Sequence, residues 1–285
     1  MKLGADTWLW AATFGKEHLF CIEEAARMGC EVIDFSINDP RVFPAQEAAK
    51  RVEDCGMVAV TSTALPLSCN PISPDREVRG KALEFMERLV DITALLGAHV
   101  TGGVNHSASG YHSGKVRSAQ EVEWCAQYLE KLTAYAGQRG VTIAMEPVKR
   151  FESHFMNTAA QALEMIELVK AQNLGVHLDT FHMNIEEASF TEAILSCGPH
   201  LKHMHLVDSN RGAPGQGHID WVEIMRALKA IGYEGTACIE TFNPNTLDET
   251  CMMTYLTRQF AKTPGEIVER GMKTLKAAMV LAGME

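Results

Sequence analysis

The sequence predicts a single (β/α)8 barrel, an α/β fold in which eight parallel strands are each followed by a helix. Short apolar runs rich in β-branched residues, typical of buried parallel strands, alternate with longer stretches of helical spacing. Eight such pairs divide the 285 residues into units that suit this fold. No glycine-rich phosphate loop follows any strand, which disfavours a doubly wound open sheet. No interdomain linker is evident, so we expect residues 1–285 to form one domain.

The expected elements follow one another in regular alternation along the whole chain. The expected strands are Leu3–Trp8, Glu31–Phe35, Val58–Ala64, Ala98–Gly102, Val141–Glu146, Gly175–Asp179, His203–Val207 and Thr236–Glu240. The expected helices are 16–28, 44–55, 77–96, 119–138, 158–170, 190–198, 221–231 and 264–280. Capping boxes are expected at Ser118–Glu121 and Thr263–Glu266, and Asn157 is expected to cap the helix that starts at Thr158. The glycines at expected helix C-caps are Gly29, Gly140 and Gly232.

The composition excludes several classes of protein. The chain carries 36 acidic and 26 basic residues, a formal net charge of −10, whereas binding of nucleic acid requires a basic face. Eight cysteines without a C-x-x-C pair indicate buried reduced thiols rather than a disulfide scaffold or zinc ribbon. No apolar run approaches the length of a membrane span, and a strand starting at Leu3 leaves no room for a signal peptide. We therefore expect a soluble cytoplasmic protein with no nucleic-acid or membrane partner.

Each of the last four expected strands carries a potential metal ligand at its carboxyl end. These residues are Glu146, Asp179, His205 and Glu240. Carboxyl ends of barrel strands point into the catalytic mouth, so the four side chains are expected to converge. Three carboxylates held together are costly unless a cation joins them. Three oxygens and one nitrogen suit Mn²⁺, Mg²⁺ or Co²⁺ better than a structural zinc site.

A single carboxylate at a strand end has more ordinary explanations. It is more often a helix N-cap or a salt-bridge partner, and the metal-site interpretation depends on the four residues occurring on successive strands. His177 and His203 lie two residues deeper in their strands. Because they would point into the barrel interior, we expect them to be hydrogen-bonded core histidines rather than ligands.

A second group of polar residues follows the same strands. Glu152, His182 and Arg211 occupy the connections after the fifth, sixth and seventh strands, and together with a metal they indicate a site for a small polyol or sugar. The long connections 103–118 and 241–263 also follow strands and should lie on the active-site face. We expect a lid or an oligomer contact there, for which Met252, Met253, Tyr255 and Leu256 offer apolar surface.

Several segments resemble one known family. They are Glu146-Pro-Val-Lys-Arg-Phe-Glu152, Leu178-Asp-Thr-Phe-His-Met-Asn-Ile-Glu-Glu187, His203-Met-His205, Asn210-Arg211 with Pro214-Gly-Gln-Gly217, and Glu240-Thr-Phe242. In these residues the chain resembles the ketose 3-epimerases, the D-tagatose 3-epimerase and D-psicose (D-allulose) 3-epimerase group of the xylose-isomerase-like barrels. The resemblance extends from about residue 60 to residue 245 and is dense in the second half of the chain.

The resemblance implies specific roles for these residues. It implies one divalent ion per subunit, most often Mn²⁺ or Co²⁺ and sometimes Mg²⁺, held by Glu146, Asp179, His205 and Glu240. It implies that Glu152, His182 and Arg211 contact the substrate near its C1 to C3 oxygens, and that the protein is a homodimer or homotetramer. The chain departs from the family at Trp8, in Gly102–Gly110, which lacks a tryptophan, and at Thr241, where proline is common. These departures concern the choice of sugar rather than the reaction.

The expected reaction is epimerisation at C3 of a free ketose of the D-psicose/D-fructose, D-tagatose/D-sorbose or L-ribulose type. A carbonyl polarised by the metal would stabilise a cis-enediolate, with Glu146 and Glu240 as base and acid on opposite faces of the sugar. An aldose–ketose isomerase of the hydroxypyruvate type and an inosose dehydratase remain alternatives, because fold analogy does not separate reactions. A non-catalytic sugar-binding protein is a further alternative from another class.

Overall fold

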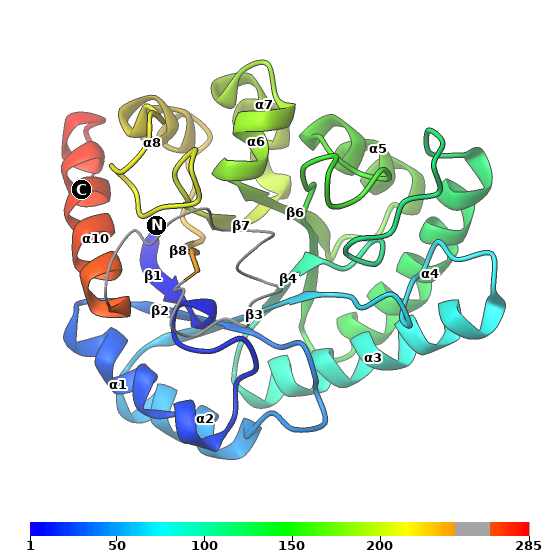
Figure 1. Cartoon of the computed structure of the whole chain (residues 1–285), viewed down its shortest axis with the longest axis horizontal. Coiled ribbons are helices and arrows are strands. Elements are labelled where there is room, and N and C mark those ends of the chain that lie inside the picture. The colour runs from blue at the N-terminus through cyan, green and yellow to red at the C-terminus, as the bar shows by residue number, and fades with distance from the viewer. Residues whose placement is uncertain (243–262, 285) are drawn as a thin grey trace.

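Eight parallel strands form a closed barrel surrounded by helices (Figure 1). The computed structural model describes residues 1–242 and 263–284. Every strand pairs with its sequence neighbour, and β1 pairs with β8 through Lys2 and Thr236, which closes the sheet on itself. The last helix lies near the N-terminus in Figure 1, where it packs against the first helix of the barrel. The predicted (β/α)8 fold is confirmed.

The elements occur in the predicted alternating order. The strands are β1 (Lys2–Asp6), β2 (Val32–Ser36), β3 (Val58–Ala64), β4 (Val100–Val104), β5 (Thr142–Met145), β6 (Leu174–Asp179), β7 (Leu201–His205) and β8 (Thr236–Ile239). The α-helices are α1 (Phe20–Arg27), α2 (Ala45–Asp54), α3 (Arg76–Leu95), α4 (Ala119–Gly137), α5 (Ala159–Val169), α6 (Thr180–Glu186), α7 (Phe190–Cys197), α8 (Trp221–Ala230) and α10 (Pro264–Leu281). The 3₁₀ helices are η1 (Thr7–Leu9), η2 (Lys16–His18) and η3 (Gly198–His200).

Only β3 has the predicted bounds; β2, β5, β6 and β8 differ from them by one residue, and three strands differ by two. β1 ends at Asp6 rather than Trp8, because the Asp6 carboxylate accepts a hydrogen bond from the Trp8 amide at 2.6 Å and starts η1. β4 starts two residues late because the amide of Ala98 donates to the carbonyl of Thr93, near the end of α3. β7 starts two residues early, where Leu201 pairs with Val176 of β6. It ends two residues early because the amide of Val207 bonds a side-chain hydroxyl of α6 instead of a strand.

The helix ends follow capping chemistry more closely than hydrophobic spacing. Ser118 and Glu121 form the predicted capping box of α4. The prediction that Asn157 caps α5 is wrong, because the cap is Thr158, whose hydroxyl accepts from the amide of Gln161. The Asn157 amide group instead donates to two carbonyls of the preceding loop. Helix α6 was not expected, since its seven residues are too few to show a hydrophobic period.

The strands present different residues to their two faces. On β2, Ile33 and Phe35 belong to the large apolar core between sheet and helices, which includes residues of nearly every helix. Val32, Val60 and Cys238 form a separate small cluster, as expected of side chains that alternate into the barrel interior. Each fully buried side chain of this size contributes roughly 1.5–3 kcal/mol. The interior is thus apolar at one end, and its polar side chains are collected near the carboxyl ends of the strands.

Two further observations complete the fold. The seven cysteines within the described residues are all free thiols, as predicted. Across residues 1–242 and 263–284, no helix combines the length and the apolar character needed to cross a membrane. The predicted contact surface around Met252 and Tyr255 lies outside the described residues.

Candidate active site

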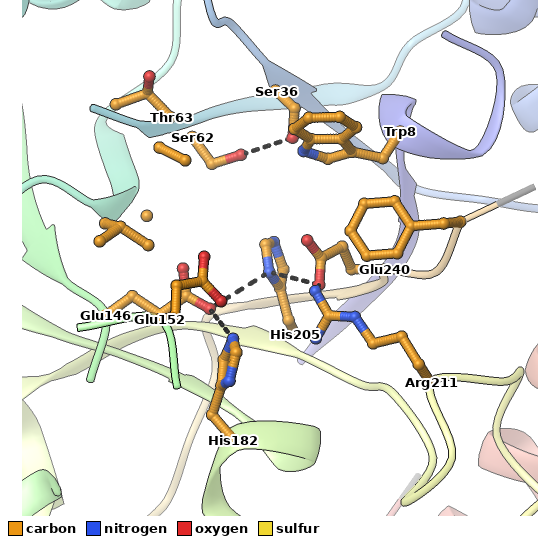
Figure 2. A pocket seen from close by; sticks show the side chains of 14 residues that line it. Trp8, Ser36, Ser62, Thr63, Glu146, Glu152, His182, His205, Arg211 and Glu240 are labelled. Atoms are coloured by element: carbon orange, nitrogen blue, oxygen red, sulfur yellow. Dashed lines mark hydrogen bonds and ion pairs between the residues drawn. The ribbon is translucent and has the colours of Figure 1, made fainter. Parts of the chain in front are cut away.

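The four predicted ligand residues lie together at the carboxyl end of the barrel, and Figure 2 shows three of them, Glu146, His205 and Glu240. Asp179 and His205 are the last residues of β6 and β7, whereas Glu146 and Glu240 follow the last residues of β5 and β8. One ligand atom each of Glu146, Asp179 and His205 lies within 4.8 Å of the others. Glu240 Oε2 lies 3.6 Å from His205 Nδ1. The structure therefore brings all four side chains to one place.

Crowding and burial shift the pKa values of these carboxyls strongly. Burial raises the pKa of Glu146 well above its usual range, and the charges of Asp179 and Glu240 add to this effect. Burial likewise raises the pKa of Glu240, to about 7. The pKa of Asp179 is lowered, because Arg211 and the neighbouring histidines outweigh the opposing effect of burial. Such a cluster holds more negative charge than its surroundings offset, which is the condition that a bound cation relieves.

His205 provides a test of whether the residues fit a metal ion. Its Nε2 lies 2.9 Å from Asp34 Oδ2, whereas its Nδ1 is buried and has no hydrogen-bond partner. Nδ1 faces the carboxylates, 3.9 Å from Glu146 Oε1 and 3.6 Å from Glu240 Oε2. A lone nitrogen amid carboxylate oxygens is a donor set for a divalent cation that prefers oxygen with some nitrogen. The residues therefore fit a divalent metal site.

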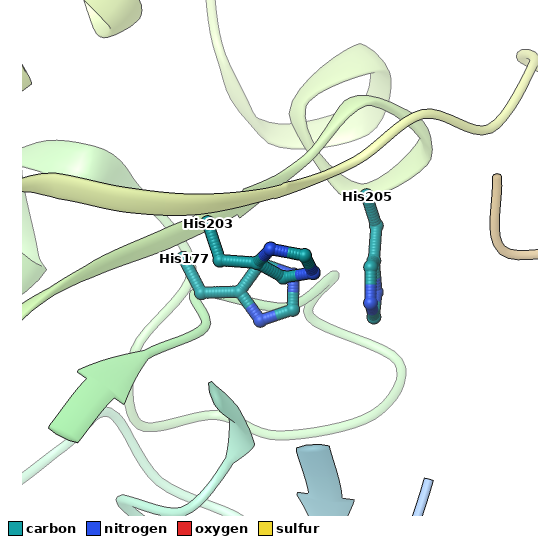
Figure 3. A group of neighbouring side chains, drawn as sticks. All are labelled: His177, His203 and His205. Atoms are coloured by element: carbon teal, nitrogen blue, oxygen red, sulfur yellow. The ribbon is translucent and has the colours of Figure 1, made fainter. Parts of the chain in front are cut away.

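His177 and His203 lie next to His205 and extend from the same pair of strands, β6 and β7 (Figure 3). His177 Nδ1 accepts the amide hydrogen of Gly103 at 3.0 Å. His203 Nε2 lies 3.0 Å from Asp34 Oδ2, and its Nδ1 lies 2.7 Å from the Thr236 hydroxyl. Burial lowers the pKa of His177 well below its usual value. The two residues are buried, hydrogen-bonded histidines whose accepting lone pairs are already in use.

Asp179 has structural duties in addition to its place in the cluster. Its Oδ1 caps α6 by accepting from the amides of Phe181 and His182. Its Oδ2 lies 2.9 Å from Arg211 Nη1, and Arg211 Nη2 lies 2.6 Å from Glu240 Oε2. Asp179 is therefore both a helix N-cap and a salt-bridge partner, the two ordinary roles of a carboxylate at a strand end.

Arg211 is held in an unusual backbone conformation. Its φ is 64°, in the left-handed region that residues other than glycine rarely adopt. The loop around it is fixed by bonds between Asp208 and both Arg211 and Gly212. The guanidinium also lies over the rings of Phe181 and Phe242, 4.9 Å from each centroid. The Arg211 side chain thus reaches a position between two carboxylates from a strained backbone conformation. Strain of this kind is common at functional sites.

The three residues predicted to contact substrate line one cavity together with Glu146, His205 and Glu240. The amide of Lys149 donates to His182 Nδ1 at 3.2 Å, which leaves a hydrogen on Nε2. Burial lowers the pKa of His182 to about 4, so the ring is neutral near pH 7. Glu152 stays charged: against the effect of burial, Lys149 and His182 lower its pKa to about 2. A neutral donor and a charged acceptor therefore face the same space.

The opposite wall of the cavity was not predicted from the sequence. Its polar residues are Ser36, Ser62 and Thr63, and the aromatic rings of Trp8 and Phe242 stand edge to face at a centroid distance of 5.3 Å (Figure 2). Gly103 and Val104, from the segment Gly102–Gly110 that lacks a tryptophan, also line it. Like the predicted ligands, the two serines occupy inward-facing positions near the carboxyl ends of their strands, β2 and β3. Their position in the strand could therefore have identified them from the sequence.

Two buried aspartates behind this wall were also missed. Asp6 and Asp34, on β1 and β2, are fully buried, and one oxygen of each lies within 4.8 Å of a His205 nitrogen. Burial and the nearby Asp34 raise the pKa of Asp6, whereas bonds from His203 and His205 lower that of Asp34 against the effect of burial. The sequence signal that could have identified Asp6 and Asp34 is the presence of a carboxylate within an otherwise apolar strand.

Comparison with known proteins agrees with the fold. Residues 22–278 match the family model described as the xylose isomerase-like TIM barrel, so the chain belongs to that family. The chain is 33% identical over 251 residues to L-ribulose 3-epimerase of Mesorhizobium japonicum, covering 87% of this chain and 84% of the relative. It is 34% identical over 237 residues to D-psicose 3-epimerase of Agrobacterium fabrum, covering 82% and 81%. Within the barrel family, the chain is a member of the ketose 3-epimerase family.

Solved structures lead to the same grouping. A structure of L-ribulose 3-epimerase superposes with a TM-score of 0.94 at 30% identity and covers 99% of this chain and 95% of its own. D-allulose 3-epimerase from Methylomonas sp., in complex with D-allulose, has a TM-score of 0.92 at 26% identity, covering 98% and 97%. The likeness extends over nearly the whole of each chain.

Proposed function

We propose that this protein is a metal-dependent ketose 3-epimerase acting on an unphosphorylated ketohexose or ketopentose. The observation that carries the proposal is the placement of Glu146 and Glu240 on either side of His205 (Figure 2). Burial raises the pKa of both carboxyls, that of Glu240 to about 7, and a raised carboxyl pKa favours proton transfer near neutral pH. Epimerisation needs this pair, because one group removes the C3 proton from one face and the other supplies a proton to the opposite face.

The ligands in this proposal are Glu146, Asp179, His205 and Glu240, and Mn²⁺ is the ion that we favour over Co²⁺ or Mg²⁺. When bound, the ion would polarise the ketose carbonyl and make the adjacent C–H more acidic. The family membership and the unpartnered Nδ1 of His205 support this assignment.

The residues around the pair would bind and orient the sugar. His182 Nε2–H donates to an oxygen near C1 or C2, and the charged Glu152 accepts from the C1 hydroxyl. Arg211 donates to oxygen as negative charge develops at C2, while its pairs with Asp179 and Glu240 keep it in place. Trp8 and Phe242 cover the apolar edge of the sugar and exclude water from the enediolate.

The charge of the cavity supports an unphosphorylated substrate. Among the described residues, its lining includes three carboxylates, Glu146, Glu152 and Glu240, but one permanently charged cation, Arg211. That cation is already paired with Asp179 and Glu240. A phosphate dianion would add like charge to this site without finding a free cationic partner.

The test is exchange of the C3 proton with solvent. The metal-stripped protein is loaded with Mn²⁺ and incubated in D₂O with D-fructose, D-psicose, D-tagatose or L-ribulose. The samples are followed by proton NMR after removal of the paramagnetic ion. We expect deuterium at C3 and the C3 epimer as product. Deuterium at C1 with an aldose product would instead establish an isomerase, and release of water would establish a dehydratase.

Controls separate catalysis from simple binding of sugar. The metal-stripped protein and the Glu146→Gln and Glu240→Gln variants should show no exchange within the same time. If the Mn²⁺-loaded protein binds a ketose, as measured by calorimetry, but exchanges no proton, it is a sugar-binding protein and the proposal fails.

Two further properties complete the proposal. We propose that residues 1–285 act as one domain, since no described segment separates the strands into two units. We also propose a homodimer or homotetramer, which light scattering coupled to size-exclusion chromatography would measure directly.

A further inference from the structure

Asp34 connects the cavity wall to the candidate metal centre. It is the middle residue of β2, is fully buried and accepts three hydrogen bonds. His205 Nε2 and His203 Nε2 both bond its Oδ2, at 2.9 and 3.0 Å, and the Ser62 hydroxyl bonds its Oδ1 at 3.0 Å. An ionised carboxylate only accepts, so both imidazoles must present N–H at Nε2.

This bond determines which nitrogen of His205 faces the carboxylates. A neutral imidazole carries one hydrogen, and a metal binds the nitrogen without it. With the hydrogen held on Nε2 by Asp34, the lone pair lies on Nδ1, the atom near Glu146 and Glu240 that has no partner. The same bond also fixes the rotation of the ring about its Cβ–Cγ bond.

We infer that Asp34 is a positioning residue that aims the Nδ1 lone pair of His205 at the bound metal ion. The inference rests on the proposed function and adds to it a residue outside the predicted ligand set. His203 contributes by donating to the same oxygen, while its own Nδ1 is fixed by Thr236. Partners of this kind orient ligand histidines and typically change metal affinity by 10–100-fold.

The alternative is that Asp34 is itself a ligand of a second cation, together with Asp6 and His205. One atom of each lies within 4.8 Å of the others. However, Asp34 already accepts three donors, and Asp6 accepts from the Trp8 amide and, at 2.7 Å, from the Ser36 hydroxyl. These bonds leave the two carboxylates satisfied by the protein, which favours the positioning role.

The first experiment measures Mn²⁺ affinity rather than activity. The full-length, metal-stripped chain is titrated with Mn²⁺, and free ion is followed by electron paramagnetic resonance. We expect one site per chain in the wild type and a Kd raised 10–100-fold in Asp34→Asn. The matched control is Ser62→Ala, which removes the bond to the other oxygen of Asp34 and should change the Kd far less. Excess Mn²⁺ should restore kcat of Asp34→Asn, which a merely structural defect would not allow.

The second measurement needs no variant and remains available if Asp34→Asn does not fold. Wild-type protein with ¹⁵N-labelled histidine is loaded with diamagnetic Mg²⁺, and the ring tautomers are assigned by long-range ¹H–¹⁵N NMR. We expect His205 to carry its hydrogen on Nε2.

Three results would overturn the inference. They are a hydrogen on Nδ1 of His205 in the loaded protein, an unchanged Kd in folded Asp34→Asn, and a second ion whose binding is lost in Asp6→Asn. Failure of the proposed function would look different, because the wild type itself would then bind no metal or exchange no C3 proton.

Discussion

Lys149 Nζ lies 2.6 Å from Glu152 Oε2, in an ion pair with side-chain exposures of only 10% and 9%. The other oxygen of Glu152 accepts from the Ser109 hydroxyl, at 2.9 Å, so the carboxylate is fixed between two loops. This lysine, which in the sequence is an ordinary loop residue, gives Glu152 a counter-charge inside the site. It thereby keeps Glu152 ionised, as the proposed role of this residue in accepting a substrate hydroxyl requires.

Removing this counter-charge in Lys149→Met should weaken both binding and stability. Losing one partner of a buried pair leaves an uncompensated charge, and we expect a loss of about 3 kcal/mol in the free energy of unfolding. We expect KM for the ketose to rise about tenfold or more, with a smaller change in kcat. Urea unfolding and steady-state kinetics measure the two effects, and Lys149→Arg, which retains the charge, is the control.

The pH dependence of this pair has a definite sign. The pKa of Glu152 is lowered to about 2 in the folded protein, below its value of about 4.3 in the unfolded chain. Its contribution to stability is therefore fully present above about pH 4.3 and is lost as the pH falls toward 2. The stability advantage of the wild type over Lys149→Met should shrink through this window. An advantage that stays constant down to pH 2 would contradict the ionic role of Lys149.

Glu146→Gln and Glu240→Gln should each slow C3 proton transfer. A positioned acid or base contributes typically 10²–10⁴-fold, so we expect kcat to fall by about that factor. The variants need to be assayed at several Mn²⁺ concentrations, because both residues are also proposed ligands. The control is Glu192→Gln on the exposed surface of α7, which should retain the wild-type kcat. A Gln variant with full kcat would remove that residue from the proton-transfer pair.

Removal of the metal should destabilise the fold. An ion that binds the folded chain at 100 times its Kd stabilises it by about 2.7 kcal/mol, and we expect Tm to fall by about 5 °C or more after chelation. Scanning calorimetry with and without Mn²⁺ measures this difference. His205→Ala should show a much smaller response to Mn²⁺, whereas equal responses would place the ion elsewhere in the molecule.

Gly103 is required where β4 enters the cavity. Its φ is 91°, and a Cβ atom there would lie 2.1 Å from the carbonyl oxygen of Thr63. Gly103→Ala should therefore cost more than about 3 kcal/mol in unfolding free energy. Gly56 is the matched control, since its φ is 65° but a Cβ there meets no atom within 4 Å. Gly56→Ala should cost about 1–2 kcal/mol, the conformational term alone. Equal losses would show that the contact with Thr63 relaxes.

Features that depend on local sequence pattern were predicted correctly more often than features that depend on particular hydrogen bonds. The barrel and the convergence of Glu146, Asp179, His205 and Glu240 were predictable, because strand period and strand order follow from local pattern. The Asn157 cap and the start of β4 were predicted wrongly because neighbouring residues compete for the same local bonds, whereas the end of β7 depends on Thr180, 27 residues away. The coordinating role of the four residues stays a prediction until a metal is measured.

The sequence by itself determined the eight-fold alternation, the family and the residues at the strand ends. Only the tertiary structure decided that Lys149 neutralises Glu152, that Arg211 joins Asp179 to Glu240, and that Asp34 holds Nε2 of His205. Asp34 and His205 are 171 residues apart in the chain. The physical reason is that a barrel places distant strand ends within hydrogen-bond distance of each other. The partner of each charged side chain then depends on barrel closure and side-chain packing, and the spacing of residues in the sequence does not predict it.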